Sequence, residues 1–252
     1  MKVTFLGTGT SVGVPRIACS CPVCRSDDPR NQRLRCSILL EHAGQTALVD
    51  TPPDLRTQAL RQGLVRLDAV LFTHAHADHL HGLDDVRCFR FGRDAPVPCY
   101  GDAATIGRIR HVFDYAFAAD HASSVPQLEL HVIDGPFPLL GRQVEPVTVF
   151  HGPLPILAFR LGSFAYVTDC SAIPPRSMEQ LQGLDVLVLD ALRHREHPTH
   201  FNVDQALEAI AALRPARAYL THIAHDLEHV ATNAALPPGV ELACDGLTLE
   251  VD

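Results

Sequence analysis

The chain has 252 residues, 46% of them hydrophobic, which is enough to bury one sizeable core, so we expect a single domain over residues 1–252. Its 21 basic and 29 acidic residues give a formal net charge of -8 at pH 7, which argues against a broad surface for binding nucleic acid. No apolar run approaches the ~18 residues of a membrane span, and no long apolar core follows Met1, so we expect a cytoplasmic protein without a membrane partner.

The first quarter of the chain predicts a strand, a hairpin and a helix. The strand Lys2–Leu6 leads into a Gly/Thr loop, Gly7–Ser11, which we expect to be a tight turn at the edge of a site. Alternating apolar residues over Ser37–Val49 predict a hairpin. The next stretch, Asp50–Gln62, predicts a helix with proline in its first turn.

A cysteine-rich loop near residues 19–24 is the first candidate metal site. Cys19, Cys21 and Cys24 lie within six residues, and clustered thiolates are typical of a closed, tetrahedral and therefore structural zinc site. Unrelated free cysteines are the alternative, since cytosolic thiols seldom pair as disulfides. No other cysteine lies close by in the sequence, so we look for the fourth ligand in the distant segment His222–His225, which offers two imidazoles.

The histidine-rich loop Thr73–His79, with the sequence Thr-His-Ala-His-Ala-Asp-His, directly follows the apolar run Ala69–Phe72. It is the strongest metal-binding motif in the chain. Packed imidazoles would repel one another if protonated, unless a cation kept them neutral. His74 and His76 can point the same way from an extended loop, whereas Asp78 and His79 point elsewhere, which suits two different ions. Asp50 is interpreted as a carboxylate that orients a ligating imidazole. The alternative is a polar surface loop.

The middle of the chain is less informative. Strands are expected near residues 97–100, 128–133 and 144–150, with a helix over about 103–115. Residues 117–127 lack a pattern and predict a loop that could overhang the site.

Three later apolar runs each end in a residue type that binds metal ions: Asp169, Asp190 and His222. Strands that finish at one edge of a layered α/β fold deliver such residues into one crevice. His151 also follows a strand, although a lone histidine is more often an ordinary polar residue. Together the residues predict two ion-binding nests bridged by Asp169, one made by His74, His76 and His151, the other by Asp78, His79 and His222.

These residues and their order resemble the metallo-β-lactamase superfamily of binuclear hydrolases, over nearly the whole chain. The resemblance implies an α/β fold of the αββα sandwich type, with a binuclear metal site at the sandwich edge. Within the superfamily the chain looks most like the PhnP-type phosphodiesterases, which act on phosphoribosyl 1,2-cyclic phosphate. The matching motifs are Phe5-Leu6-Gly7-Thr8-Gly9, Cys19-x-Cys21-x-x-Cys24, Thr221-His222-Ile223-Ala224-His225 and Asp245-Gly246.

The resemblance also implies roles for single residues. The structural zinc site of the family maps onto Cys19, Cys21, Cys24 and His225. The active-site histidine maps onto His200, the expected proton donor to the departing alkoxide. Without the resemblance, His200 would be interpreted as a solvent-exposed loop histidine beside His194 and His197. Asp78 and His200 are the predicted catalytic residues.

The expected function is a metal-dependent phosphodiesterase that cleaves a small cyclic phosphodiester, such as phosphoribosyl 1,2-cyclic phosphate or a related nucleotide. Two ions roughly 3.5 to 4 Å apart would activate water for in-line attack. The His/Asp ligand set suits zinc, manganese or iron, and one further zinc is structural. Asp169, where β-lactamases carry a cysteine, is similar to the phosphodiesterase branch. The sequence Thr51–Arg56 departs from the family pattern and leaves the substrate open.

Two other functions remain open. One is an RNA-end-processing nuclease of the tRNase Z type, which the acidic charge and the missing basic arm disfavour. The other is a non-catalytic, metal-stabilised binding protein, as suggested for superfamily members of quinone cofactor biosynthesis, and the intact ligand set weighs against it. The sequence is compatible with a homodimer but does not decide the oligomeric state.

Overall fold

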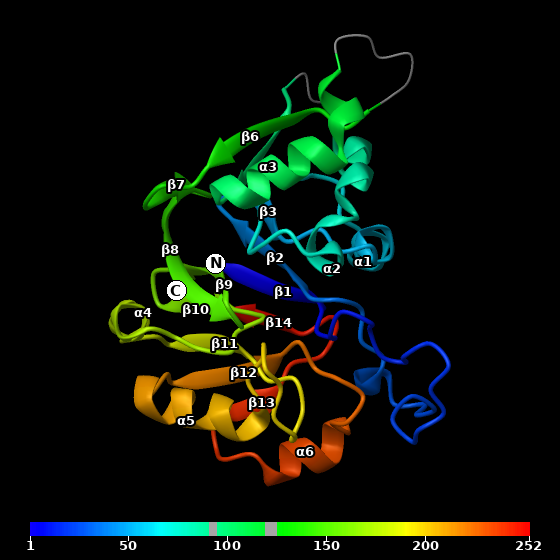
Figure 1. Cartoon of the computed structure of the whole chain (residues 1–252), viewed down its shortest axis with the longest axis vertical. Coiled ribbons are helices and arrows are strands. Elements are labelled where there is room, and N and C mark those ends of the chain that lie inside the picture. The colour runs from blue at the N-terminus through cyan, green and yellow to red at the C-terminus, as the bar shows by residue number, and fades with distance from the viewer. Residues whose placement is uncertain (91–94, 119–124) are drawn as a thin grey trace.

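The computed structural model describes residues 1–90, 95–118 and 125–252, and within them two sheets lie face to face (Figure 1). The strands of the first sheet are β1 (Lys2–Gly7), β2 (Ser37–His42), β3 (Gln45–Val49), β4 (Ala69–Leu71), β5 (Val97–Gly101), β6 (Leu128–Val132) and β14 (Thr248–Glu250). Their order is β14-β1-β2-β3-β4-β5-β6. The pairs from β14 to β3 are antiparallel, and those from β3 to β6 are parallel.

The second sheet is also mixed. Its strands are β7 (Phe137–Leu139), β8 (Arg142–His151), β9 (Leu154–Leu161), β10 (Phe164–Val167), β11 (Val186–Asp190), β12 (Arg217–Thr221) and β13 (Val240–Leu242). Their order is β13-β12-β11-β10-β9-β8-β7, parallel from β10 to β13 and antiparallel from β7 to β10. In both sheets the parallel strands end at the same edge, and this edge receives the predicted ligands.

Helices cover the outer faces of the two sheets (Figure 1). They are α1 (Leu55–Gln62), α2 (Ala77–Leu80), α3 (Ala103–Val112), α4 (Pro175–Gln180), α5 (Val203–Leu213) and α6 (His229–Ala235), with the 3₁₀ helices η1 (Pro29–Asn31), η2 (Leu83–Arg90) and η3 (Asp114–Phe117). The arrangement confirms the predicted αββα sandwich. None of these helices has the length and apolarity of a membrane span.

Three apolar cores hold the layers together. The central core lies between the sheets, where alternate side chains such as Phe5, Ile38 and Tyr166 are fully buried. The other two lie between each sheet and its helices. Alternation along a strand sends successive side chains to opposite faces, so a strand such as β11, buried on both faces, reads as a continuous apolar run.

The predicted elements agree with the structure except at their ends. The hairpin is confirmed, and the helix that we expected to begin at Asp50 begins at Leu55. Two prolines and the left-handed Asp50, at φ 65°, keep the intervening residues out of the helix. The helix predicted to reach residue 115 ends at Val112. Within the predicted loop 117–127, residues 119–124 lie outside the described residues.

The Gly/Thr loop is more than the tight turn expected from the sequence, because its backbone joins the two sheets. Gly9 forms parallel bridges with both Arg35 and Ile223. The Ile223 N–H donates to the Thr8 carbonyl at 2.9 Å, and the Thr10 N–H donates to the Ile223 carbonyl at 3.1 Å. This cross-link therefore ties the start of the first sheet to the end of the second beside the predicted metal site.

A pair of glycine substitutions tests how closely the backbones approach at this cross-link. A Cβ on Gly7 would lie 2.0 Å from the Arg35 carbonyl oxygen, whereas nothing lies within 4 Å of one on Gly107 in α3. Gly7→Ala should lower the free energy of unfolding by about 3 kcal/mol through overpacking, and Gly107→Ala should raise it by up to about 1 kcal/mol. Urea denaturation measures both. A Gly7→Ala protein as stable as its parent would contradict this account.

Candidate metal centre

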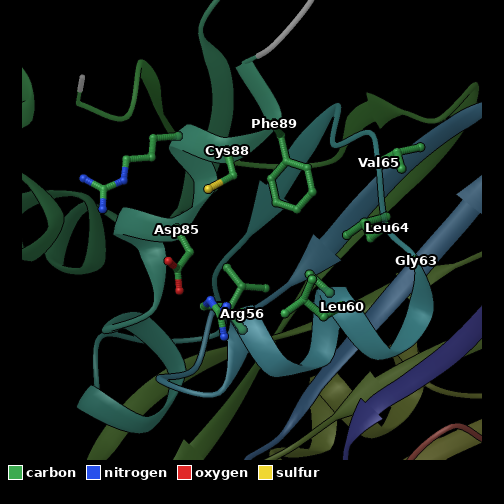
Figure 2. A pocket seen from close by; sticks show the side chains of 11 residues that line it. Arg56, Leu60, Gly63, Leu64, Val65, Asp85, Cys88 and Phe89 are labelled. Atoms are coloured by element: carbon green, nitrogen blue, oxygen red, sulfur yellow. The ribbon is translucent and has the colours of Figure 1, made fainter.

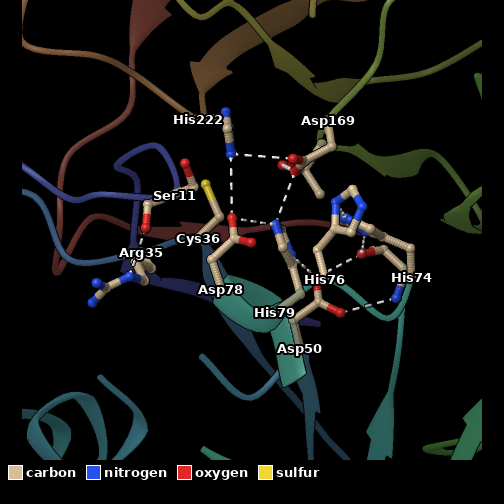
Figure 3. Close-up of polar contacts among 12 residues, drawn as sticks. Ser11, Arg35, Cys36, Asp50, His74, His76, Asp78, His79, Asp169 and His222 are labelled. Atoms are coloured by element: carbon tan, nitrogen blue, oxygen red, sulfur yellow. Dashed lines mark hydrogen bonds and ion pairs between the residues drawn. The ribbon is translucent and has the colours of Figure 1, made fainter. Parts of the chain in front are cut away.

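The structure brings the six residues of the two predicted nests and Asp169 together at one edge of the sandwich. Figure 3 labels all of them except His151. His74 and His76 follow β4, and Asp78 and His79 lie on the short α2 directly after them. The others come from the second sheet: His151 ends β8, Asp169 follows β10, and His222 follows β12. The donors are therefore delivered by strand ends, by the loops that follow them and by α2.

The first nest, which we call the three-histidine nest, contains His74, His76 and His151. Their donor atoms lie within 4.8 Å of one another. The His151 Nδ1 is hydrogen-bonded to the Thr199 carbonyl at 2.8 Å, and the His74 Nδ1 to the Thr73 hydroxyl at 3.0 Å. These contacts leave the Nε2 atoms of both rings for the nest, where the His74 Nε2 lies 2.9 Å from the His76 Nδ1.

The second nest, which we call the four-donor nest, contains Asp78, His79, Asp169 and His222, again within 4.8 Å. The His79 Nε2 lies 3.1 Å from one Asp169 oxygen, and the His222 Nε2 lies 3.1 Å from the other. His79 donates its other N–H to Asp50 at 2.7 Å. Asp50 therefore has the orienting contact that the sequence predicted.

The donor set fits a pair of divalent cations. The Nε2 atoms of His79 and His222 are buried without a hydrogen-bond partner, although buried polar atoms are normally paired. Imidazole nitrogens and carboxylate oxygens converge from three sides, and these are the ligands that zinc, manganese and iron accept. Leaving a buried polar atom unpaired costs about 1–3 kcal/mol, so an ion that occupied these atoms would relieve that cost.

Carboxylates raise the pKa values of two imidazoles in the four-donor nest. Burial acts against protonation of His222, but the carboxylates of Asp169, Asp78 and Asp190 raise its pKa to about 8. Burial likewise opposes the positive charge on His79, yet the carboxylates around it raise its pKa well above the usual value. These protons occupy the positions that a metal ion would fill, so ion binding must displace them.

His200 lies against both nests and is not the exposed loop residue that the sequence alone suggested. It is only 8% exposed, and its ring stacks on His222 with centroids 4.5 Å apart. The His151 ring lies 4.6 Å away. Burial, together with the neighbouring His222 charge, lowers the pKa of His200 to about 3. Of the other loop histidines, His194 is exposed and His197 is half-buried.

Asp190 is a site residue to which the sequence analysis gave no role. Its Oδ2 accepts from the His200 Nδ1 at 3.0 Å, while its Oδ1 lies 3.7 Å from the His222 Nδ1. Asp190 ends β11, and its place at this edge agrees with the strand-end pattern of the sequence, which did not indicate what it contacts. Cys36 is a second buried neighbour, with its sulfur 3.4 Å from the Thr221 hydroxyl.

The cysteine cluster is assembled as the resemblance implied. Donor atoms of Cys19, Cys21, Cys24 and His225 lie within 4.8 Å of one another. The His225 Nδ1 lies 3.3 Å from the Cys21 sulfur and 3.5 Å from the Cys19 sulfur. The hydrogen bond with His225 lowers the pKa of Cys21, which favours the thiolate form that binds metal. Three thiolates and one imidazole fit a tetrahedral zinc site.

An apolar cavity lies elsewhere, away from both nests. A pocket of about 740 Å³ between α1 and η2 is lined by residues that include Leu60, Leu64, Val65 and Phe89 (Figure 2). Arg56 and Arg87 also line it, but none of the candidate metal ligands does. The polar edge of the sandwich, rather than this cavity, therefore holds the groups capable of hydrolytic chemistry.

Comparison with known proteins agrees with this geometry. Residues 45–223 match the beta-lactamase superfamily domain. The crystal structure of a diphosphatase from the PhnP family is 47% identical, with a TM-score of 0.93 over 98% of this chain and 96% of that one.

Two further relatives were found by sequence. An octanoyltransferase of Porphyromonas gingivalis is 38% identical over the whole chain, which spans only 52% of that protein. A ribonuclease Z of Mycobacterium bovis is 29% identical over 77% of this chain and 71% of its own length. The family match, the fold and the PhnP-family likeness agree, and the chain belongs to the metallo-β-lactamase superfamily as a PhnP-like member.

Proposed function

We propose that this metal-dependent hydrolase cleaves a small phosphodiester, with the two nests each holding one divalent ion. The observation that carries the proposal is the position of Asp169, whose two oxygens face His79 and His222 at 3.1 Å. A carboxylate at this position, together with a buried histidine beside both nests, suits phosphoryl transfer. The similarity to a diphosphatase of the PhnP family and to a ribonuclease Z supports a reaction at phosphorus.

Bound divalent ions would supply activation of water and neutralisation of phosphoryl oxygens. The protein itself orients the ligands and positions His200. Thr73 and Thr199 fix two of the imidazoles, and Asp50 fixes a third, so that the ligands are oriented before substrate arrives. Asp190 accepts the Nδ1 proton of His200 and can stabilise a positive charge on that ring.

His200 is the proposed general acid. Its Nδ1 contacts Asp190, and one of its ring nitrogens lies within 4.8 Å of donor atoms of His151 and Asp169. To act as an acid there, His200 must carry a proton on both ring nitrogens, so its pKa, which burial and the His222 charge lower to about 3, must rise when bound ions displace the His222 proton. His200 is therefore placed to act on the leaving group, while Asp190 positions it.

The proposed substrate is a cyclic ribose phosphate or a related small phosphodiester. A diphosphate ester is the second candidate, because the PhnP-family relative at 47% identity is a diphosphatase. Extended RNA ranks below both. The formal charge of -8 would oppose the binding of a polyanion whose affinity depends largely on phosphate contacts.

The reaction class is tested by a substrate panel with purified protein loaded separately with zinc, manganese or iron. Bis(p-nitrophenyl) phosphate should be hydrolysed, small cyclic phosphates or diphosphate esters should have a higher kcat/KM, and β-lactams should be poor substrates. Omitting metal should abolish turnover. Strong lactam hydrolysis without phosphodiester cleavage would contradict the role assigned to Asp169.

Metal content gives a second prediction. Elemental analysis should find about three ions per chain, with zinc at the cysteine cluster because thiolate-rich tetrahedral sites prefer it. Cys21→Ser should remove about one zinc and lower the melting temperature, since structural zinc contributes directly to folding. A variant that kept its zinc and its stability would show that the cysteines were misassigned.

Substitution of His200 should separate proton transfer from metal binding. His200→Ala should lower kcat by about 10²- to 10⁴-fold on substrates with an alkoxide leaving group while both nest ions stay bound. The loss should shrink on p-nitrophenyl esters, whose leaving group needs little protonation. His76→Ala is the matched control and should impair both substrate types. Equal losses on both substrates for His200→Ala, or loss of metal, would rule out the general-acid role.

A further inference from the structure

Four buried histidines belong to the two nests, but they are not held in the same way. Three of them have an Nδ1 hydrogen bond: His74 with Thr73 at 3.0 Å, His79 with Asp50 at 2.7 Å and His151 with Thr199 at 2.8 Å. His222 has no hydrogen-bond partner at either ring nitrogen, and the nearest Asp190 oxygen is 3.7 Å from its Nδ1. Since that second bond normally orients a ligating imidazole, the His222 ring depends for its orientation on its backbone and on the His200 ring stacked against it.

The backbone at His222 is itself in an uncommon conformation. Its φ is 58°, in the left-handed region that residues with a Cβ adopt only where the surrounding structure holds them. On its C-terminal side, Ile223 is paired with Thr8 and Thr10, and the Ala224 N–H donates to Leu192 at 2.9 Å. The position of His222 therefore depends on how firmly the stretch that follows it is anchored.

That stretch ends in the cysteine cluster. His225, three residues after His222, reaches Cys21 and Cys19 through its Nδ1. The cysteine loop has little apolar support of its own, since its buried hydrophobic cluster among the described residues consists of Val14, Val23 and Cys24. A cation held by three thiolates and His225 would consequently fix both the loop and the far end of the His222 segment.

We propose that His225 is a positioning residue for the catalytic site, and that the cation of the cysteine cluster holds His222 in its ligating position through the backbone of Ile223 and Ala224. The inference rests on the proposed function, because it requires both nests to bind ions. Emptying the cysteine cluster should weaken ion binding at the four-donor nest by about 10- to 100-fold, the usual effect of losing a group that orients a ligand. The three-histidine nest should keep its affinity, because each of its buried histidines has its own hydrogen bond.

The test compares His225→Ala with His225→Cys by calorimetric titration of Mn²⁺ into protein that holds zinc only at the cysteine cluster. Mn²⁺ prefers oxygen and nitrogen donors to thiolates, so it reports on the two nests. His225→Ala should weaken one of the two Mn²⁺ sites by about 10- to 100-fold and leave the other unchanged. His225→Cys keeps four zinc ligands and should restore the parent affinities. In a His76→Ala background, which disables the three-histidine nest, the weakened site should be the one that remains.

Ile109→Ala is the control for a general loss of stability, because Ile109 is fully buried in the core under α3 and belongs to neither nest nor the cysteine cluster. It should leave both Mn²⁺ affinities unchanged. If His225→Ala does not fold, Cys19→Ser takes its place. Unaltered Mn²⁺ binding in the cluster variant, equal weakening of both nests, or the same weakening in Ile109→Ala would overturn the inference.

The proposed function would fail in a different way. In that case the parent protein would bind no Mn²⁺ at the nests, or it would bind Mn²⁺ without hydrolysing any phosphodiester. An inference that failed alone would leave the parent with two Mn²⁺ sites and full phosphodiesterase activity, but with no difference between His225→Ala and His225→Cys.

Discussion

Charge balance among buried groups is the constraint on which the metal edge depends. Apart from the exposed His76 and the half-buried Asp78, the carboxylates and imidazoles of the nests are buried, and an unpaired buried charge is costly. Asp50 shows how the fold meets this requirement: it accepts from the Thr73 N–H, the Thr73 hydroxyl and His79. Asp169 instead faces His79 and His222, and the unpaired Nε2 atoms of those two rings mark where cations belong. Cations bound at this edge would therefore complete the charge balance among its buried groups.

The same edge concentrates backbone strain. Asp50, Asp169 and His222 each follow a strand, and each has a φ between 54° and 65°. A left-handed residue with a Cβ costs of order 1–3 kcal/mol and persists only where its surroundings enforce it. Glycine would relieve that cost but has no side chain to bind a metal ion or to orient a ligand. The turn of the chain at these three positions aims the side chains into the site, and the three cores supply the stability that permits it.

The sequence predicted what local spacing determines. His74, His76, Asp78 and His79 lie within six residues, so their partition between two nests follows from geometry along the chain. Asp190 received no role because its contacts with His200 and His222 arise only when β11 and β12 lie side by side. The role of the Gly/Thr loop as a cross-link between the sheets could not be predicted from the sequence either, because its partner Ile223 lies near the other end of the chain.

That cross-link has a consequence for the order of folding. Contacts between residues distant in sequence are slow to form, because the entropy of closing the intervening loop is lost before the contact stabilises anything. Thr8 and Thr10 must meet Ile223, and β1 must meet β14, before the His222 segment has its native course. The three-histidine nest needs only residues from the central part of the chain. The two nests of one active site would then form at different times. The three-histidine nest would form first, and the four-donor nest would be completed when the two ends of the chain have docked.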